Sequence, residues 1–297
     1  MDCHPAVSIE WSPNHVPSGL YRALLLRRRP GLADSETLPA IAVQGSNIKV
    51  ARDWLDEYRF VTMTPGDDDT APLMFPHALL GSAHLMMLAH DNFPLGSFGL
   101  LHLRNHAIRY RDFGIDQPWD VSCVLARQRQ VEKGLEFDFD TTISIDGESV
   151  WRSVSTFLKR GKPNGELEIS PLADLFPPID EAVPESGHFD VPHNIGRRYA
   201  KVTGDYNPIH VSSLVAKLFG FNRAIAHGMW SLARVLPELP PVDNPVRIDV
   251  SFKGPMYVTS RATIKTDTDG RFELFCGTNP RPVIVGAYQN ALPDELI

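Results

Sequence analysis

The sequence predicts an α+β fold in which a strongly curved antiparallel sheet wraps around a central helix, and this arrangement occurs twice. Each half of the 297-residue chain contains one apolar stretch with helical spacing, followed by four strand-like runs. No helical pattern lies between these strands, which argues against a parallel sheet. Residues 164–190 are rich in Pro, Glu and Asp and indicate a linker. We therefore expect an N-terminal domain at residues 1–163 and a C-terminal domain at residues 191–297.

The pattern of the first half starts with an apolar helix at residues 75–90. Further along, Lys133-Gly134 and Asp146-Gly147 are signals for tight turns, which join antiparallel strands. The strands predicted in this half are residues 100–112, 120–134, 135–147 and 148–160.

The second half repeats the order. Residues 224–236 have the spacing of a helix, which Pro237 closes. Asp269-Gly270 marks a hairpin between two of the strands that follow. The strands predicted here are residues 246–254, 259–270, 271–277 and 282–289.

Residue identities also favour an internal duplication. The stretch "YRFVTMT" at residues 58–64 precedes the first helix, and "YAKVTGD" at residues 199–205 precedes the second, so that a tyrosine and a threonine recur at the same spacing. His77 and His227 then occupy corresponding places at the starts of the two helices. These matches are few, but they come in the same order in both halves.

The comparison fails at one place, and this place is the best candidate for a site. Asp205 and His210 lie in "GDYNPIH", a turn-rich run for which the first half has no counterpart. One interpretation is a surface turn whose polar side chains cap backbone groups. The other is an acid–base site, and it is favoured because a purely structural loop is expected in both halves.

The run "RRYAKVTGDYNPIH", with "AKLFGF" and "AIAHGMW" after it, resembles the hydratase-2 motif of the MaoC-like acyl dehydratases. These are (R)-specific enoyl-thioester hydratases and 3-hydroxyacyl dehydratases with a hot-dog fold. The match is dense from Arg197 to Trp230. The resemblance implies a double hot-dog protein in which residues 1–163 form a degenerate hot-dog domain and residues 191–297 form the catalytic one.

Residue by residue, the resemblance implies that Asp205 and His210 are the catalytic pair. It implies that Asn207 shapes the site and that the backbone N–H of Gly228 stabilises an oxyanion. The residue types suit this chemistry, because adding water to an enoyl thioester needs a group that takes a proton from water and a group that gives one to the α-carbon. It also needs donors at the thioester oxygen, which a helix starting near Gly228 offers. Which of Asp205 and His210 moves which proton stays open.

Several nearby residues are predicted to be structural. Tyr199 is expected in the core because the first half keeps it, and His227 is expected at the helix start with a local hydrogen bond because His77 matches it. His77 and His84 share a helix face without a carboxylate or cysteine, so core histidines are favoured and no metal site is predicted. Apolar residues of the first helix are expected in the core, or at the border of an acyl-chain tunnel: Leu79, Leu80, Met86 and Met87.

Charge and composition limit the partners. The net charge of −7 argues against a nucleic-acid binder that relies on bulk electrostatics. Basic residues that flank the candidate site either bind the phosphates of coenzyme A or a carrier-protein phosphopantetheine at its mouth, or form a solvated basic face. These residues are Arg197, Arg198, Lys201, Lys217 and Arg223.

The setting is expected to be the cytoplasm. Three scattered cysteines, Cys3, Cys123 and Cys276, do not form a disulfide framework and indicate a reducing compartment. The start of the chain has no signal-peptide pattern, and no apolar run is long enough to span a membrane.

The predicted function is the reversible hydration of trans-2-enoyl thioesters to (R)-3-hydroxyacyl thioesters, with no metal or redox cofactor. One alternative is a hot-dog thioesterase, which has no need of the whole "GDYNPIH" loop. Another is a non-catalytic subunit that binds acyl thioesters, which would be favoured if Asp205 or His210 were absent. A double hot-dog pairs its sheets within one chain, so either a monomer or a homodimer is expected.

Overall fold

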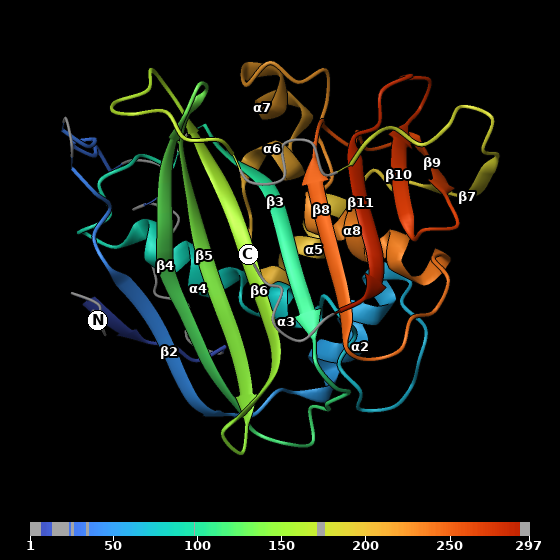
Figure 1. Ribbon diagram of the computed structural model, residues 1–297, viewed down its shortest axis with the longest axis horizontal. Helices are drawn as coiled ribbons and strands as arrows, with labels where there is room; N and C mark the ends of the chain where they lie inside the picture. The colour runs from blue at the N-terminus through green and yellow to red at the C-terminus, as the bar shows by residue number, and fades with distance from the viewer. Residues whose placement is uncertain are drawn as a thin grey trace.

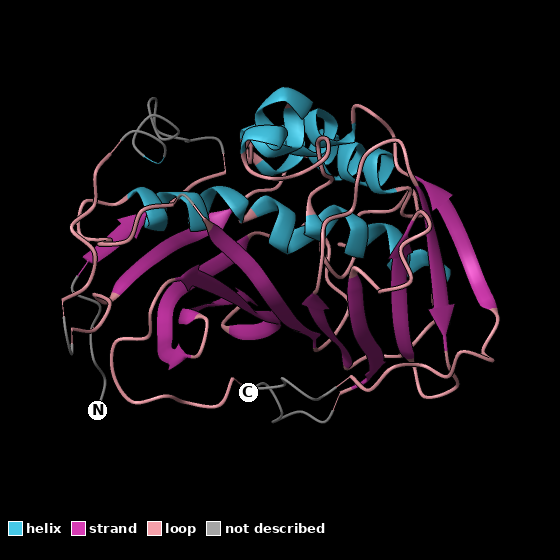
Figure 2. Ribbon diagram, turned by 90° about the horizontal axis from the view of Figure 1, so that it is seen from above, coloured by secondary structure: helices cyan, strands magenta, loops and turns pink. Residues whose placement is uncertain are grey.

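One curved sheet of eleven strands runs through the whole computed structural model, and helices pack on one of its faces (Figures 1 and 2). This confirms the predicted α+β class. The hydrophobic core lies between the sheet and the helices and contains the buried side chains of Phe75, Trp119 and Trp230. The structure describes residues 7–13, 24, 27–33, 36–97, 99–170 and 176–291.

In the first half, long strands surround the two short helices α3 and α4, and a further helix, α2, precedes them. The predicted helix 75–90 is divided into α3 and α4 at Leu80, whose N–H bonds to the carbonyl of Pro76. The elements are β1 (Val7–Glu10), β2 (Ile41–Ile48), α2 (Arg52–Thr62), α3 (Phe75–Leu79), α4 (Gly81–Ala89), β3 (Leu100–Arg109), β4 (Trp119–Val131), β5 (Gly134–Ile145) and β6 (Glu148–Arg160).

The second half contains more helices and shorter strands. The predicted helix 224–236 begins only at Gly228, because Ala226 is held in an extended segment by a hydrogen bond from its N–H to the carbonyl of Met256 (2.7 Å). The elements are β7 (Glu185–Asp190), α5 (Ile195–Thr203), α6 (Pro208–Val211), α7 (Ser213–Leu218), α8 (Gly228–Val235), η1 (Leu236–Glu238), β8 (Val246–Phe252), β9 (Arg261–Thr266), β10 (Arg271–Cys276) and β11 (Ile284–Asn290).

The order of the strands shows the duplication clearly. Leaving out β1 at the edge, the strands of the first half follow one another towards the middle of the sheet as β2-β4-β5-β6-β3. From the opposite edge towards the middle, the strands of the second half follow as β7-β9-β10-β11-β8, so the corresponding strands occur in the same order in both halves. The two halves meet where β3 pairs antiparallel with β8 (Figure 1). At this seam His106 of β3 and Asp249 of β8 form a buried pair with 2.6 Å between Nδ1 and Oδ1.

The two predicted antiparallel sheets lie edge to edge, as a double hot-dog that pairs its sheets within one chain implies, and only the expectation of purely antiparallel pairing is corrected. The β3–β8 pairing joins them into one sheet, and β1 pairs parallel with β2, which makes the sheet mixed. Sequence patterns do not reveal the first point, because the pairing of two strands 140 residues apart along the chain depends on the folded arrangement of both halves.

The predicted linker, residues 164–190, is more ordered than a linker at both of its ends. At its start, the N–H of Glu168 bonds to the carbonyl of Gln130, and the hydroxyl of Ser170 donates to Glu136 (both 2.8 Å). At its end, β7 pairs with β9 and is the counterpart of β2. The C-terminal fold thus starts at Glu185, before the predicted boundary at 191. Residues 171–175 lie outside the described residues.

Local details support the predicted repeat and turns. The hydroxyls of Thr62 and Thr203 donate to the carbonyls of Tyr58 and Tyr199, at 2.8 and 3.2 Å, in the last turns of α2 and α5. Both helices end in a left-handed residue, Met63 (φ 57°) and Gly204 (φ 74°). The hairpin between β5 and β6 has positive φ at Asp146 and Gly147, as a type I′ turn requires.

Two of the three cysteines lie in the described part of the chain. Cys123 and Cys276 are free and buried, whereas Cys3 lies outside the described residues. None of the helices in the described part of the chain is long and apolar enough to cross a membrane.

Candidate active site

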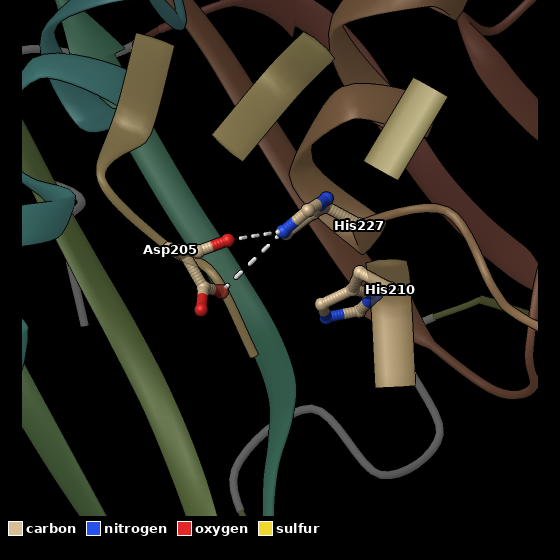
Figure 3. A group of neighbouring side chains, drawn as sticks. All are labelled: Asp205, His210 and His227. Carbon is tan, nitrogen blue, oxygen red and sulfur yellow. Dashed lines mark hydrogen bonds and ion pairs between the residues drawn. The ribbon is translucent and has the colours of Figure 1, made fainter. Parts of the chain in front are cut away.

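Three side chains meet where α5 ends and α8 begins: Asp205, His210 and His227 (Figure 3). Their carboxylate and imidazole atoms lie within 4.8 Å of one another. Asp205 follows α5, His210 lies on the single turn of α6, and His227 is the N-cap of α8. The structure thus brings together the two residues predicted as a pair and adds a third.

Asp205 is positioned by the end of α5. Gly204 takes the left-handed conformation there, and the N–H of Asp205 then donates to the hydroxyl of Thr203 (3.1 Å). The carboxylate accepts the N–H of Asn207 (3.1 Å), which fixes its direction, and the side chain is about a third exposed. Asp205 is therefore held by backbone contacts while its carboxylate stays within reach of solvent.

Asn207 has a clear structural task. Its side-chain oxygen accepts the N–H of Ile209 and so caps α6, the one-turn helix that begins with Pro208. The predicted turn is present at residues 204–207, whereas His210, which was placed in the same turn-rich run, belongs to α6. The turn residues indicated a loop. The short helices α5 and α6 flank it, and Asn207 caps the second of them.

His210 is fixed by two contacts. Its Nδ1 lies 2.9 Å from the carbonyl oxygen of Ile225, so Nδ1 carries the hydrogen and Nε2 keeps a lone pair. Gly196 of α5 packs against its backbone so closely that a Cβ there would lie 1.8 Å from the His210 carbonyl oxygen. Burial lowers the pKa of His210, although Asp205 and the Ile225 carbonyl oppose this. The ring is therefore neutral at physiological pH.

His227 lies at the start of α8 with a hydrogen bond nearby, as predicted, and it is also part of the cluster. Its Nε2 donates to the carbonyl of Asp205 (3.0 Å), which is the expected local bond, and lies 3.6 Å from the Asp205 carboxylate. The ring stacks on His210 with 3.7 Å between centroids. Burial and the neighbouring His210 lower the pKa of His227 to about 3. Its Nδ1 is buried and has no hydrogen-bond partner.

Sequence reasoning missed His227 and Gly196 for the same reason. Both act across space, His227 on Asp205 and Gly196 on His210. The one usable signal for His227 was its place beside Gly228. The signal for Gly196 was a glycine inside a segment that otherwise favours a helix.

Gly228 begins α8, so its N–H has no acceptor within the helix. The helix dipole places partial positive charge at the same point. The absence of a side chain serves packing, because a Cβ at Gly228 would lie 2.9 Å from two carbons of the Phe252 ring. Gly228 is therefore required by the packing of Phe252, in addition to the role predicted for its N–H.

The predicted scaffold residues are in the core or at helix ends. Tyr199 is buried, burial raises its pKa, and its ring lies 5.2 Å from that of His227. The hydroxyl of Ser212 accepts the N–H of Val215 and caps α7. Gly220 follows this helix with a positive φ of 86°.

The five predicted basic residues do not all face the cluster. Arg197 and Lys201 are exposed on α5, and Lys217 is exposed on α7. The guanidinium of Arg198 lies over the ring of Phe60 (4.8 Å), and that of Arg223 lies over Tyr257 (5.5 Å). These contacts hold two of the cations against aromatic rings, and neither cation is bonded to a residue of the cluster.

Comparison with known proteins gives consistent results. A family model described as "MaoC like domain" matches residues 181–273. The chain is 31% identical over 205 residues to "3-hydroxyacyl-thioester dehydratase X" of Mycobacterium tuberculosis, which covers 68% of this chain and 72% of that protein.

Solved structures agree over both halves of the chain. The crystal structure of HtdX from Mycobacterium tuberculosis has a TM-score of 0.69 at 26% identity and covers 84% of this chain and 100% of its own. A MaoC-like dehydratase from Phytophthora capsici has a TM-score of 0.64 at 16% identity, with coverage of 86% and 97%, which shows likeness of fold alone. The expected double hot-dog fold is confirmed.

Proposed function

This chain belongs to the family of MaoC-like dehydratases, and we propose that Asp205 and His210 are the acid–base pair of its hydro-lyase reaction. The reaction interconverts 3-hydroxyacyl thioesters and 2-enoyl thioesters by loss or gain of water. One observation is the main support for choosing Asp205 and His210. Asp205, His210 and His227 are the only group of three or more His, Cys, Asp or Glu residues in the described part of the chain whose ligand atoms lie within 4.8 Å of one another, and they lie beside the open N-terminus of α8.

In the direction of hydration, a water molecule lies between Asp205 and His210. The neutral ring of His210 has its Nε2 lone pair available, and the Asp205 carboxylate accepts a hydrogen bond from the same water. As the water oxygen bonds to the β-carbon, the pair takes up one proton. The electrons of the double bond move to the thioester oxygen, which is then enolate-like. The pair returns one proton to the α-carbon, so that one molecule of water has been added.

The thioester oxygen is stabilised by the start of α8. The N–H of Gly228 and the positive end of the helix dipole both point to the place where the negative charge develops. His227 holds Asp205 through the bond to its carbonyl and packs against His210, so it positions both members of the pair. We assign (R) configuration to the 3-hydroxyacyl product.

The reaction as written needs no metal or redox cofactor. Asp205, His210 and His227 are residue types that bind divalent metals, but coordination would occupy the His210 lone pair that takes the proton. Activity is therefore expected to survive exhaustive dialysis against a chelator. A loss that added Zn²⁺ or another divalent ion restores would contradict this assignment.

The acyl group is carried by coenzyme A or by a carrier protein, and both end in the same phosphopantetheine. Exposed cations on α5 and α7, Lys201 and Lys217, are the candidates for binding its phosphates. We place the enzyme in the cytoplasm, in keeping with its two free buried cysteines. Because β3 and β8 already pair within the chain, a monomer is complete, and a homodimer adds no strand to this seam.

The test is the ultraviolet absorbance of a conjugated enoyl thioester mixed with purified protein. We expect the absorbance to fall as the double bond is hydrated, without release of free thiol. A panel of short, medium and long chains on coenzyme A and on carrier protein covers the substrate range. Thiol release at the rate of the absorbance change would indicate a thioesterase instead, and no change with any thioester would indicate a non-catalytic subunit.

A further inference from the structure

A second cluster of polar groups lies in the core of the first half, and the reaction described above makes no use of it. Three imidazoles meet there: His77 of α3, His84 of α4 and His102 of β3. The ring centroids of His77 and His84 are 5.4 Å apart, and those of His77 and His102 are 5.7 Å apart. The cluster thus connects two helices, α3 and α4, to one strand of the sheet, β3.

The unusual property of this cluster is that each ring has an unused polar atom. The Nε2 atoms of His77, His84 and His102 are all buried and have no hydrogen-bond partner. In the part of the chain that the structure describes, only five buried side-chain polar atoms lack a partner, and these are three of them. Such atoms are costly unless a ligand or an ordered water satisfies them, so three at one place point to a bound oxygen.

The cluster adjoins the candidate active site through a single aromatic ring. His102 contacts Phe252 of β8 with 5.0 Å between ring centroids. The same Phe252 ring packs directly on Gly228, the proposed oxyanion donor. The three histidines therefore lie on the helix-covered side of the sheet, one ring beyond the place assigned to the thioester.

The surroundings of the cluster are aromatic. His102 stacks on Phe157 of β6 at 4.7 Å, and His84 stacks on Phe139 of β5 at 4.9 Å. Apolar aromatic walls with a few polar atoms are typical of pockets that bind small molecules or acyl chains. Leu79 of α3 and Met87 of α4 are buried in the core. This was the first of the two alternatives predicted for them.

The charge state favours hydrogen bonding over ion binding. Burial lowers the pKa of His77 to about 4 and that of His102 to about 3, and burial together with these two rings lowers the pKa of His84 well below its usual value. All three rings are neutral and can accept or donate one hydrogen bond at Nε2. A preformed metal site is not indicated, because no group containing them has the spacing of metal ligands among the described residues.

We propose that His77, His84 and His102 bind a hydroxyl or keto oxygen on the acyl chain, beyond the β-carbon, and so select oxygenated acyl thioesters as substrates. This inference rests on the proposed function, because it requires the acyl chain to extend from the thioester at Gly228 past Phe252 to the three histidines. A chain of plain methylenes leaves the three Nε2 atoms unsatisfied, whereas an oxygen at the right carbon satisfies at least one of them.

The test compares thioesters of one chain length. The series carries a hydroxyl or keto oxygen at successive carbons beyond the double bond, and the plain 2-enoyl-CoA is the reference. At one position we expect kcat/KM to be about tenfold higher than for the reference, as one well-placed hydrogen bond allows. If every oxygenated chain reacts as slowly as the plain one or more slowly, the histidines bind ordered water only and the proposal is wrong.

Two variants connect the preference to the cluster. His102→Phe and His84→Phe keep an aromatic ring and remove the polar atoms, and each is expected to lower the ratio of kcat/KM for oxygenated over plain chains towards one. His188→Phe, on the exposed strand β7, is the matched control and is expected to keep the wild-type ratio. An unchanged ratio in both cluster variants would overturn the proposal, and thermal melting shows which of the two is folded.

A binding measurement separates this proposal from the proposed function. Saturated acyl-CoA thioesters with and without the chain oxygen do not react, so their Kd values report on the pocket alone. We expect about tenfold tighter binding of the oxygenated compound at the preferred carbon. If binding shows this preference while no enoyl thioester is hydrated, the proposed function fails and the pocket assignment stands. If hydration occurs without any preference, the reverse holds.

Discussion

At the scale of residues, the site depends on what differs between two similar segments. Tyr58 and Tyr199 correspond, and so do Thr62 and Thr203, yet the first half has Thr64 where the second has Asp205. The structure shows why the shared residues are scaffold, since they form the same hydrogen bond at the ends of α2 and α5. Asp205, in whose place the first half has Thr64, contributes the carboxylate of the site.

The first prediction concerns the proposed pair. Asp205→Asn and His210→Gln keep the size and most of the packing of each side chain but remove its ability to take up a proton. Each variant is expected to lose roughly a hundredfold or more in kcat, because a positioned acid or base contributes about 10²–10⁴. Steady-state hydration rates measure the loss, and unchanged thermal melting is the control. A rate near that of the wild type in either variant removes that residue from the mechanism.

The second prediction concerns Gly196. A methyl group here meets the carbonyl oxygen of His210, so Gly196→Ala must displace α6. We expect about a tenfold or greater fall in kcat, together with a loss of stability of roughly 1–3 kcal/mol from overpacking. Gly161→Ala is the control, since nothing lies within 4 Å of a Cβ there. Equal rates in the two variants would show that the contact with Gly196 does not place His210.

At the scale of elements, the sequence predicts strands better than it predicts helix ends and edge strands. The eight long strands that follow the central helices were all predicted, because alternation and turn pairs such as Asp146-Gly147 are local signals. β1, β2 and β7 were missed. β7, "ESGHFD", is an edge strand with mostly exposed side chains, and its pairing with β9 is a tertiary contact that no local pattern reveals.

The start of α8 shows the same limit. Ala224, Ile225 and Ala226 are apolar and continue the helical spacing, but the fold uses them as an extended segment that bonds to Met256 and to the ring of His210. Their role is therefore to bring His210 and His227 together. The candidate pair itself was predicted from the repeat and the motif, whereas its third member needed the distance between residues that are 22 positions apart.

The third prediction compares corresponding helix ends. Thr203→Val and Thr62→Val remove the same hydroxyl from the last turns of α5 and α2, and each is expected to cost about 1 kcal/mol of stability. Only the Thr203 hydroxyl also accepts the N–H of Asp205, so only Thr203→Val is expected to lower kcat. Urea unfolding and hydration rates measure the two effects. Loss of activity in Thr62→Val of the same size would refute this division between scaffold and site.

At the scale of the whole molecule, the duplication has left one catalytic centre and one buried histidine cluster. The β3–β8 seam makes the two halves a single sheet, and Phe252 of the second half contacts His102 of the first. We propose that the first half completes the environment of the site through this contact. Among the described residues, no group that contains His77 brings a carboxylate to it in the way that Asp205 accompanies His227.

The fourth prediction concerns stability and pH. Five buried histidines have pKa values below the usual 6.5, so the folded protein binds fewer protons than the unfolded chain once the pH falls below about 6.5. Their stabilising contribution is present above that pH and is lost as the pH falls towards about 4. These residues are His77, His84, His102, His210 and His227.

Urea midpoints at several pH values between about 7 and 5 measure this loss, and His84→Phe is expected to reduce the proton uptake on unfolding by about one. Glu136 and Asp249 also have lowered pKa values, but they act only below about pH 4.5. Stability that stays constant from about pH 7 to 5 would mean that these rings are already charged in the folded protein.

The central claim is that this chain adds water across the double bond of an acyl thioester and leaves the thioester intact. The most direct measurement is mass spectrometry of the product formed from a 2-enoyl-CoA in water labelled with heavy oxygen. The account predicts one labelled water in the product, with the label at the β-carbon and coenzyme A still attached. Free coenzyme A together with an unsaturated acid labelled in its carboxylate would contradict it.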